Sequence, residues 1–316
     1  MSFNITIEVL DGFSNRLHLN TVLNLVVNIP TIYFIVFHSS KAMGFYKYYL
    51  LYTVVTTLVM DLHQTFFYGI YFLLPSMVNY LIFNINISVV GFGLLSLAGY
   101  RYFSLNGSFN FFEKKITLFG LFFVGIVYPI PTVITLVLAS FDQNEKEITN
   151  LVKNQSPEFL SLTKLGICSS FKTAPLGYLY MGISGLQIGL VEFLGFFFTL
   201  RTVSVLKSLK GSLSKTTYSV QKQFLISMSL QILIPIFTLL MPISLVMFLA
   251  ILNVRNSSFF SEIAVHIMTL HAPLNGLVIL LSIKPYRDAL KKFTSFKFFN
   301  INVQIFAVTT SETTDR

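Results

Sequence analysis

Long apolar stretches alternate with polar segments along most of the chain. Each is about as long as the helix of roughly 20 residues that crosses the hydrocarbon layer of a bilayer. We place seven of them, at residues 21–37, 49–74, 78–97, 116–139, 176–200, 224–252 and 263–283. The pattern predicts an all-α bundle of seven transmembrane helices over residues 21–283. It leaves an N-terminal tail (1–20), a long polar loop (140–175), a basic loop (201–222) and a C-terminal segment (284–316).

The distribution of Lys and Arg orients this bundle, because the short cytoplasmic loops of membrane proteins are enriched in basic residues. With the N-terminus outside, the inner segments hold 16 basic residues and the outer segments hold six. The N-terminus is therefore predicted to lie outside and the C-terminus inside. Sequons at Asn4, Asn154 and Asn256 then fall on the outer side, where N-glycosylation takes place.

The composition supports a membrane protein and argues against several other classes. Of the 316 residues, 54% are hydrophobic and 11% are charged, and the mean hydropathy is +0.71, whereas soluble domains carry about a quarter charged residues. The single cysteine, Cys168, excludes a disulfide within the chain and a zinc site built on paired cysteines. No nucleotide-binding or HExxH motif is present. We therefore expect no enzymatic activity, no cofactor, no metal and no nucleic-acid partner.

Few ionisable residues fall inside the apolar stretches, and such groups are costly in lipid unless they meet a partner or water. Asp61 lies in the second stretch with His63 nearby, Glu192 lies midway along the fifth, and His271 lies in the seventh. We expect Asp61 and His63 to form a polar core. Glu192 and His271 are candidate ligand-binding residues, with Glu192 suited to a cationic or hydrogen-bonding ligand. The alternative for the acids is interhelical hydrogen bonding that fixes packing.

The predicted inner face carries candidate contacts for a cytoplasmic partner. Arg101 ends the third helix, where it either contacts a cytoplasmic partner or anchors the helix at the interface. The 201–222 loop has five cations and no acid, among them Lys207, Lys210 and Lys215. Such a loop suits an acidic partner or the anionic inner leaflet.

Prolines punctuate the last two helices. Pro235 and Pro242 are expected to bend the sixth helix, either as a hinge or as a fixed packing feature. In Lys284-Pro285-Tyr286-Arg287 the proline ends the seventh helix. The apolar positions 286, 290, 293 and 296 then recur at helical spacing between lysines. This pattern predicts a short amphipathic helix lying in the interface.

Several segments, in order along the chain, carry a family resemblance. They are KAMGFYKYYLL at 41–51, LSKTTYSVQKQF at 213–224, QILIP at 231–235 and KPYRD at 284–288, together with Asp61, His63 and His271. In these segments the chain resembles the nematode serpentine chemoreceptors, and among them the related classes H and I.

The resemblance implies a G-protein-coupled receptor in the plasma membrane of a sensory neuron or its cilium. Its expected partners are a volatile or water-soluble small molecule, a heterotrimeric G protein and the lipid bilayer. One departure concerns the third helix, where the family often has an acid shortly before the arginine. Here Ala98, Gly99 and Tyr100 precede Arg101, so an ionic lock through an acidic neighbour is not expected.

Two other functions remain as alternatives. An odorant-gated ion channel also has seven helices, but its N-terminus lies inside, which the distribution of basic residues opposes. A small membrane transporter needs a pathway lined by several intramembrane charges, and only Asp61 and Glu192 are available.

Overall fold

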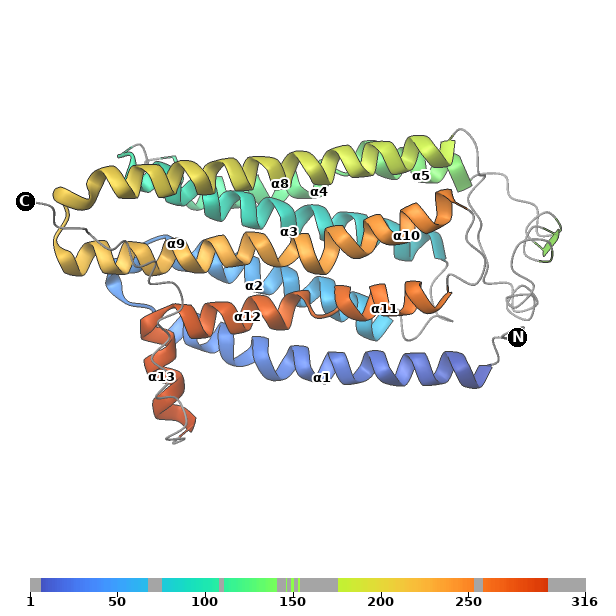
Figure 1. The fold of residues 1–316 in the computed structure, drawn as a ribbon, viewed down its shortest axis with the longest axis horizontal. Coiled ribbons are helices and arrows are strands. Elements are labelled where there is room, and N and C mark those ends of the chain that lie inside the picture. Colours follow the sequence, from blue (N-terminus) through green and yellow to red (C-terminus); the bar gives the residue numbers. More distant parts are fainter. Residues whose placement is uncertain are drawn as a thin grey trace, which may run out of the picture.

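The computed structural model describes residues 7–67, 76–107, 111–140, 146, 149–150, 153, 176–252 and 258–294. Long helices dominate these residues and run side by side (Figure 1). They are α1 (Ile7–Phe37), α2 (Tyr46–Leu62), α3 (Ser76–Leu105), α4 (Lys115–Val127), α5 (Ile130–Ser140), α8 (Leu176–Ser208), α9 (Lys215–Pro235), α10 (Met241–Ile251), α11 (Ser258–Met268), α12 (His271–Ser282) and α13 (Lys284–Thr294).

Several of these helices join end to end, so that the bundle consists of seven rods. One rod is α4 with α5, another is α9 with α10 through the π-helical segment η5 (Ile236–Leu240), and a third is α11 with α12. Six rods are long and apolar enough to cross a membrane. The other rod is α2, which continues as the π-helical segment η2 (His63–Phe67) up to the end of that described stretch.

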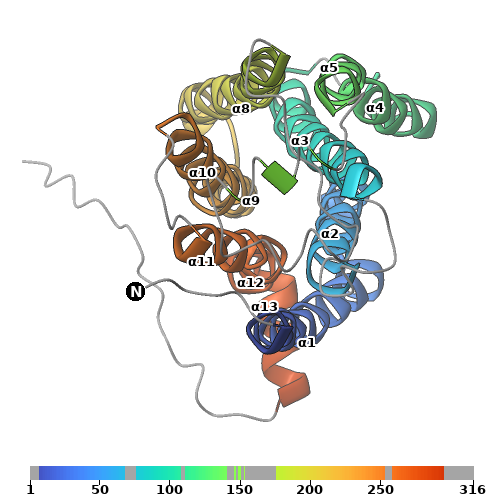
Figure 2. The same cartoon turned by 90° about the vertical axis from the view of Figure 1, so that its right-hand side faces the viewer.

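Seen along their length, the rods form a closed ring, with the α4–α5 rod on its outer side next to α3 and α8 (Figure 2). Helix α1 packs against α2 on one side and against α12 on the other. Helix α3 contacts α2, α4 and α8, and the ring closes through the contacts of α8 with α9 and of α9 with α12. Residues far apart in the sequence are thereby brought into one interior.

Many large apolar side chains lie on the outer surface, and polar side chains lie in the interior beside the apolar core. Phe119 and Ile116 of α4 are each 77% exposed, and Leu186 of α8 is 73% exposed. Asn28 of α1 and Asn275 of α12 are fully buried. Apolar side chains on the outside are compatible with lipid tails, whereas polar side chains are stabilised by hydrogen bonds to one another between the helices. The outer surface of the bundle therefore suits hydrocarbon.

Most helices extend beyond the apolar stretches that predicted them. The first begins at Ile7 rather than at 21, the third ends at Leu105 rather than at 97, and the fifth ends at Ser208 rather than at 200. Hydrophobicity marks the part of a helix in hydrocarbon, but the backbone hydrogen bonds continue into water until a breaker occurs.

The predicted basic loop at 201–222 is consequently mostly helical. Helix α8 continues through its first third, and the short 3-10 helix η4 (Leu209–Gly211) follows. Helix α9 begins at Lys215, where the Ser214 side chain accepts a hydrogen bond of 3.1 Å from the Thr217 N–H. That is the usual role of an N-cap serine, so the sequence itself starts the helix here.

Three rods are interrupted, and proline accounts for two of the interruptions. Pro129 falls between α4 and α5, and Pro235 ends α9 just before η5. Proline has no N–H to donate and its ring clashes with the preceding turn. The break between α11 and α12, at Thr269 and Leu270, has no proline of its own, and Pro273 follows in the first turn of α12, where it is tolerated.

Helix α13 leaves the bundle at a steep angle, near the opposite end from the start of α1 (Figure 1). The turn occurs at Ile283, whose backbone is extended (φ −94°, ψ 110°), directly before Lys284 and Pro285. The helix is amphipathic, with Tyr286 fully buried against the bundle. This is the geometry of the interfacial helix that the sequence predicts after the seventh span.

Gly276 of α12 allows close packing against α1. A Cβ at this position would lie 2.8 Å from Asn28 Oδ1, 2.9 Å from Val27 Cγ1 and 3.2 Å from Thr31 Oγ1. Gly276→Ala is therefore expected to destabilise the fold by about 1–2 kcal/mol, because overpacking forces neighbours out of place. Thermal unfolding of the purified protein measures the effect. Gly189→Ala on α8, where a Cβ meets nothing within 4 Å, is the matched control and should not be destabilised.

Candidate functional site

A pocket lies between α3, the junction of α4 with α5, α8 and the region around η5. Its empty space measures about 670 Å³, a volume that includes space open to the surroundings. Its lining is mostly apolar, with a few polar groups, and includes Asn84, Tyr128, Gln187, Glu192, Pro235 and Leu239. A mostly apolar lining with a few polar groups is typical of small-molecule sites in proteins.

Hydrogen bonds hold the wall of the pocket between α8 and the α4–α5 junction. The Gln187 side chain donates to the Tyr128 carbonyl at 2.8 Å, and the Tyr128 hydroxyl donates to the Gln187 carbonyl at 3.0 Å. The Thr132 hydroxyl donates to the Gln187 side-chain oxygen. Because the amide of Gln187 is used in this way, it fixes the wall rather than remaining available to a ligand.

Glu192 lines this pocket and lies within one helical turn of the buried residues Val191 and Gly195 of α8. It is partly buried and has neither an ion pair nor a hydrogen bond to any residue that the structure describes. A carboxylate at membrane depth is costly without a partner. The pocket therefore places a carboxyl group where it can meet a cationic or hydrogen-bonding group of a ligand.

His271, the other predicted ligand-binding residue, does not line this pocket. It is fully buried at the start of α12, where its Nδ1 lies 3.1 Å from the Thr238 hydroxyl of η5. The contact joins the sixth and seventh rods. The structure thus separates the two residues that the sequence analysis grouped as ligand-binding.

The Asp61 side chain binds the backbone of the seventh rod just after its break at Thr269 and Leu270. Its Oδ2 accepts a hydrogen bond of 2.9 Å from the N–H of Ala272, the second residue of α12. Leu270, at the N-cap position of α12, has no side-chain oxygen with which to do this. Asp61 of α2 therefore does the work of the missing N-cap from another helix, and its carboxyl group lies at the positive end of the α12 dipole. His63 is buried one residue beyond α2, in η2.

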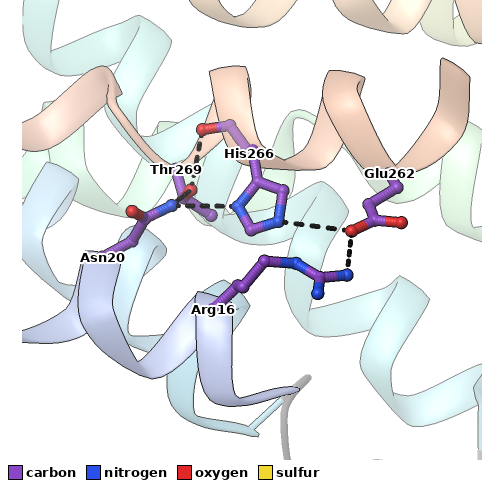
Figure 3. A network of polar contacts seen from close by, with 5 residues as sticks. All are labelled: Arg16, Asn20, Glu262, His266 and Thr269. Carbon is purple, nitrogen blue, oxygen red and sulfur yellow. Dashed lines mark hydrogen bonds and ion pairs between the residues drawn. The ribbon is translucent and has the colours of Figure 1, made fainter. Parts of the chain in front are cut away.

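A second polar network joins α1 to α11 near the end of the bundle where α1 begins (Figure 3). Arg16 forms an ion pair with Glu262, and His266 Nε2 lies 3.9 Å from the same carboxylate oxygen. The Asn20 side chain donates to the Thr269 hydroxyl at 2.7 Å and lies 3.3 Å from His266 Nδ1.

The hydropathy pattern does not predict this network, because it leaves residues 1–20 as a tail. A signal was nevertheless present, since polar residues recur every four positions at Arg16, Asn20, Asn24 and Asn28. Four-residue spacing puts side chains on one face of a helix. The stripe continues inward, where the Asn28 amide donates to the Asn24 side-chain oxygen at 2.5 Å.

Arg101 lies inside the bundle at the inner end of α3 and is only 5% exposed. Its guanidinium carbon is 3.7 Å from the ring centre of Tyr46 and 4.1 Å from that of Phe224. Its Nη1 donates to the Gln221 side-chain oxygen at 3.0 Å. The Arg101 cluster, which we define as Arg101, Tyr46, Gln221 and Phe224, thus joins α3 to α2 and α9 through aromatic faces and a neutral amide.

The Lys284-Pro285-Tyr286-Arg287 segment attaches α13 to the bundle. The Tyr286 hydroxyl lies 2.7 Å from the Ser39 hydroxyl, and the Lys284 N–H donates to the Gln223 side-chain oxygen at 3.4 Å. Burial raises the pKa of the Tyr286 hydroxyl above its ordinary value, so this contact is neutral at physiological pH. The Arg287 side chain donates to the Leu281 carbonyl at 3.3 Å.

The other predicted sites differ in how far the structure describes them. Lys207, Lys210 and Lys215 are all exposed at the inner ends of α8 and α9. Asn4, Asn154 and Asn256 lie outside the described residues, as does most of the predicted 140–175 loop. Within the described ranges, no three His, Cys, Asp or Glu side chains are placed to hold a metal ion.

Comparison with known proteins agrees with this architecture. The model of the family described as serpentine type 7TM GPCR chemoreceptor Srh matches residues 9–296, nearly the whole bundle and α13. No curated protein matches the sequence. The predicted resemblance to the nematode serpentine chemoreceptors is therefore confirmed. The chain belongs to the Srh family of serpentine seven-transmembrane chemoreceptors.

Proposed function

We propose that this chain is a chemosensory receptor that binds a small molecule in the pocket around Glu192 and signals to a heterotrimeric G protein at its inner face. The proposed location is the plasma membrane of a sensory neuron or its cilium. A volatile or water-soluble ligand reaches the pocket from outside. The apolar lining takes up its hydrocarbon part, and Glu192 binds a cationic or hydrogen-bonding group.

The observation that carries this proposal is that the pocket and the Arg101 cluster share two rods. Helix α3 contributes Asn84 and Leu94 to the pocket and then Arg101, about 10 Å beyond Leu94 at 1.5 Å per residue. The sixth rod contributes Pro235 to the pocket and Phe224 to the cluster, about 16 Å apart on the same basis. A shift between these rods at the pocket is thus transmitted to the cluster.

A ligand acts on this arrangement by preferring one relative position of α3 and the sixth rod. Pro235 and the η5 segment lie beside the pocket, and a π-helical segment after a proline is a weak point of a helix. Movement there separates Gln221 and Phe224 from Arg101. The guanidinium then becomes available to a G protein, and the exposed Lys210 and Lys215 add positive charge at the same face.

The first test is a response screen in cells that display the tagged chain on their surface. A broad panel of volatile and water-soluble chemicals is applied, and calcium is recorded through a coupled G protein. At least one chemical is expected to evoke a response that untransfected cells lack. The response should disappear when heterotrimeric G proteins are inhibited. A response that persists under inhibition contradicts the proposal and favours the ion channel.

Glu192→Gln then tests the pocket. The concentration of a cationic ligand that gives half the maximal response is expected to rise at least about ten-fold, because a charge-assisted hydrogen bond is lost. Asp288→Asn on α13 is the control, since it removes the same charge far from the pocket and should leave the response unchanged. An unchanged response of the Glu192→Gln variant to every active chemical rules out this role for Glu192.

A further inference from the structure

A groove runs between α8 and α9 near their inner ends, on the lipid-facing side of the bundle. The empty space within the groove measures about 700 Å³ and is largely open to the surroundings. Its walls include Leu206 and Lys207 from α8, and Tyr218, Lys222, Leu225 and Ile226 from α9. The groove is separate from the pocket around Glu192, with which it shares no lining residue.

The charged groups of the groove are gathered at one end. Lys207 lies in the last turn of α8 and Lys222 lies two turns into α9, so that one lysine stands on each wall. From Lys222 the α9 wall continues through Leu225 and Ile226 to Leu230, about 12 Å toward the membrane centre. That length is most of one leaflet of a hydrocarbon layer of roughly 30 Å.

The stretch of chain that forms the groove carries charge of one sign. No Asp or Glu occurs in the sequence between Glu192 and Glu262, whereas six basic residues do, five of them from Arg201 to Lys222. Neither Lys207 nor Lys222 forms an ion pair within the part of the chain that the structure describes. The groove therefore presents two unneutralised cations above an apolar channel.

These features match one type of molecule. An anionic phospholipid has a phosphate group with a negative charge at the interface and an acyl chain that extends into hydrocarbon. Lysines near a membrane surface attract such headgroups, and the positive-inside distribution places this end of the bundle at the inner leaflet, where anionic lipids are enriched. The Tyr218 side chain, one helical turn before Lys222 on α9, adds an amphipathic group to the same groove.

We propose that this groove is a binding site for one anionic phospholipid of the inner leaflet. Lys207 and Lys222 hold its phosphate from the two walls, and its acyl chain lies over Leu206, Leu225 and Ile226. Because the lipid contacts α8 and α9 together, it also stabilises the packing of these two helices. The proposal depends on the orientation of the bundle and not on the identity of the chemosensory ligand.

The test uses the full chain in nanodiscs of phosphatidylcholine that contain an increasing fraction of phosphatidylserine. After release from the nanodiscs, native mass spectrometry counts the phosphatidylserine molecules that remain bound. The unaltered chain is expected to retain one at a low phosphatidylserine fraction. The Lys207→Gln/Lys222→Gln variant should need a phosphatidylserine fraction about 25-fold higher to retain one lipid, since each lysine near an anionic surface raises the affinity about five-fold.

Two further variants distinguish lipid binding in the groove from general electrostatic attraction of anionic lipids to the protein surface. Lys210→Gln/Lys215→Gln removes the same charge from neighbouring positions outside the groove, and it should keep the bound lipid. Ile226→Trp keeps both lysines but fills the apolar channel, and it should lose the lipid. Thermal unfolding in pure phosphatidylcholine shows that each variant is folded.

Three results would overturn the proposal. Equal weakening by both double-lysine variants would mean diffuse electrostatic attraction. Retention of the lipid by Ile226→Trp would mean that the acyl chain does not use the channel. Equally strong binding of soluble glycerophosphoserine, which lacks acyl chains, would mean a site for phosphate groups and not for lipid.

Discussion

Asp61→Ala is expected to lower the free energy of unfolding by about 2–4 kcal/mol. The substitution leaves the buried N–H of Ala272 without an acceptor and removes the carboxyl group that lies at the N-terminus of α12. Since the lost contact joins the second rod to the break in the seventh, both should loosen together. Thermal unfolding of the purified chain in nanodiscs measures the loss, and the fraction of tagged chain that reaches the cell surface reports it in cells.

Asp61→Asn distinguishes the hydrogen bond from the charge. Asparagine has nearly the same shape and retains a side-chain oxygen that can accept from Ala272. It also avoids the cost of a carboxylate at membrane depth. We therefore expect Asp61→Asn to be much closer to the unaltered chain than Asp61→Ala. Equal loss in both variants would show that the charge, and not the cap, is what the fold requires.

Weakening the α9 side of the Arg101 cluster should raise signalling in the absence of ligand. Gln221→Ala removes the hydrogen bond to the guanidinium, and Phe224→Leu removes an aromatic face while keeping an apolar side chain. A buried cation on an aromatic ring and a hydrogen bond to a charged group contribute about 2 kcal/mol each. The combined variant is thus expected to increase the ratio of open to closed receptor at least ten-fold.

Basal calcium or G-protein turnover, scaled to the amount of receptor at the surface, measures this change. Gln223→Ala is the matched control, because Gln223 is also on α9 but its side chain accepts from the Lys284 N–H. It should leave basal signalling unchanged. If Gln221→Ala/Phe224→Leu behaves like Gln223→Ala, the Arg101 cluster does not hold the inactive state.

The sequence was sufficient to predict the seven-helix bundle and the interfacial helix after it. Both rest on local physics, since a stretch of apolar residues long enough to cross a bilayer has few alternatives to a helix. The amphipathic pattern after Pro285 likewise depends only on residues within α13. Helix ends were less well predicted, as at Ile7, because helices continue past the hydrocarbon where hydropathy no longer reports on them.

The sequence shows which residue types are suited to contacts between helices, but not which residues contact each other. The sequence shows that Asp61 and Glu192 are unusual in lipid, but not that Asp61 caps α12 while Glu192 faces a pocket. Arg101 is a further example. Without an acidic neighbour, its partners could not be inferred, since Tyr46 and Phe224 come from stretches far away in the chain and use ring faces instead of charge.

The π-helical segment η5 also changes how this chain should be aligned with others. A π-helical turn amounts to an α-helix with one residue inserted, and each residue of an α-helix turns the chain by about 100°. Residues of α10 therefore face the interior in a register offset by one from that of α9. An alignment with a chain whose sixth helix is straight needs a single-residue gap within Ile236–Leu240. Without that gap, pocket residues such as Ile243 would be paired with lipid-facing ones.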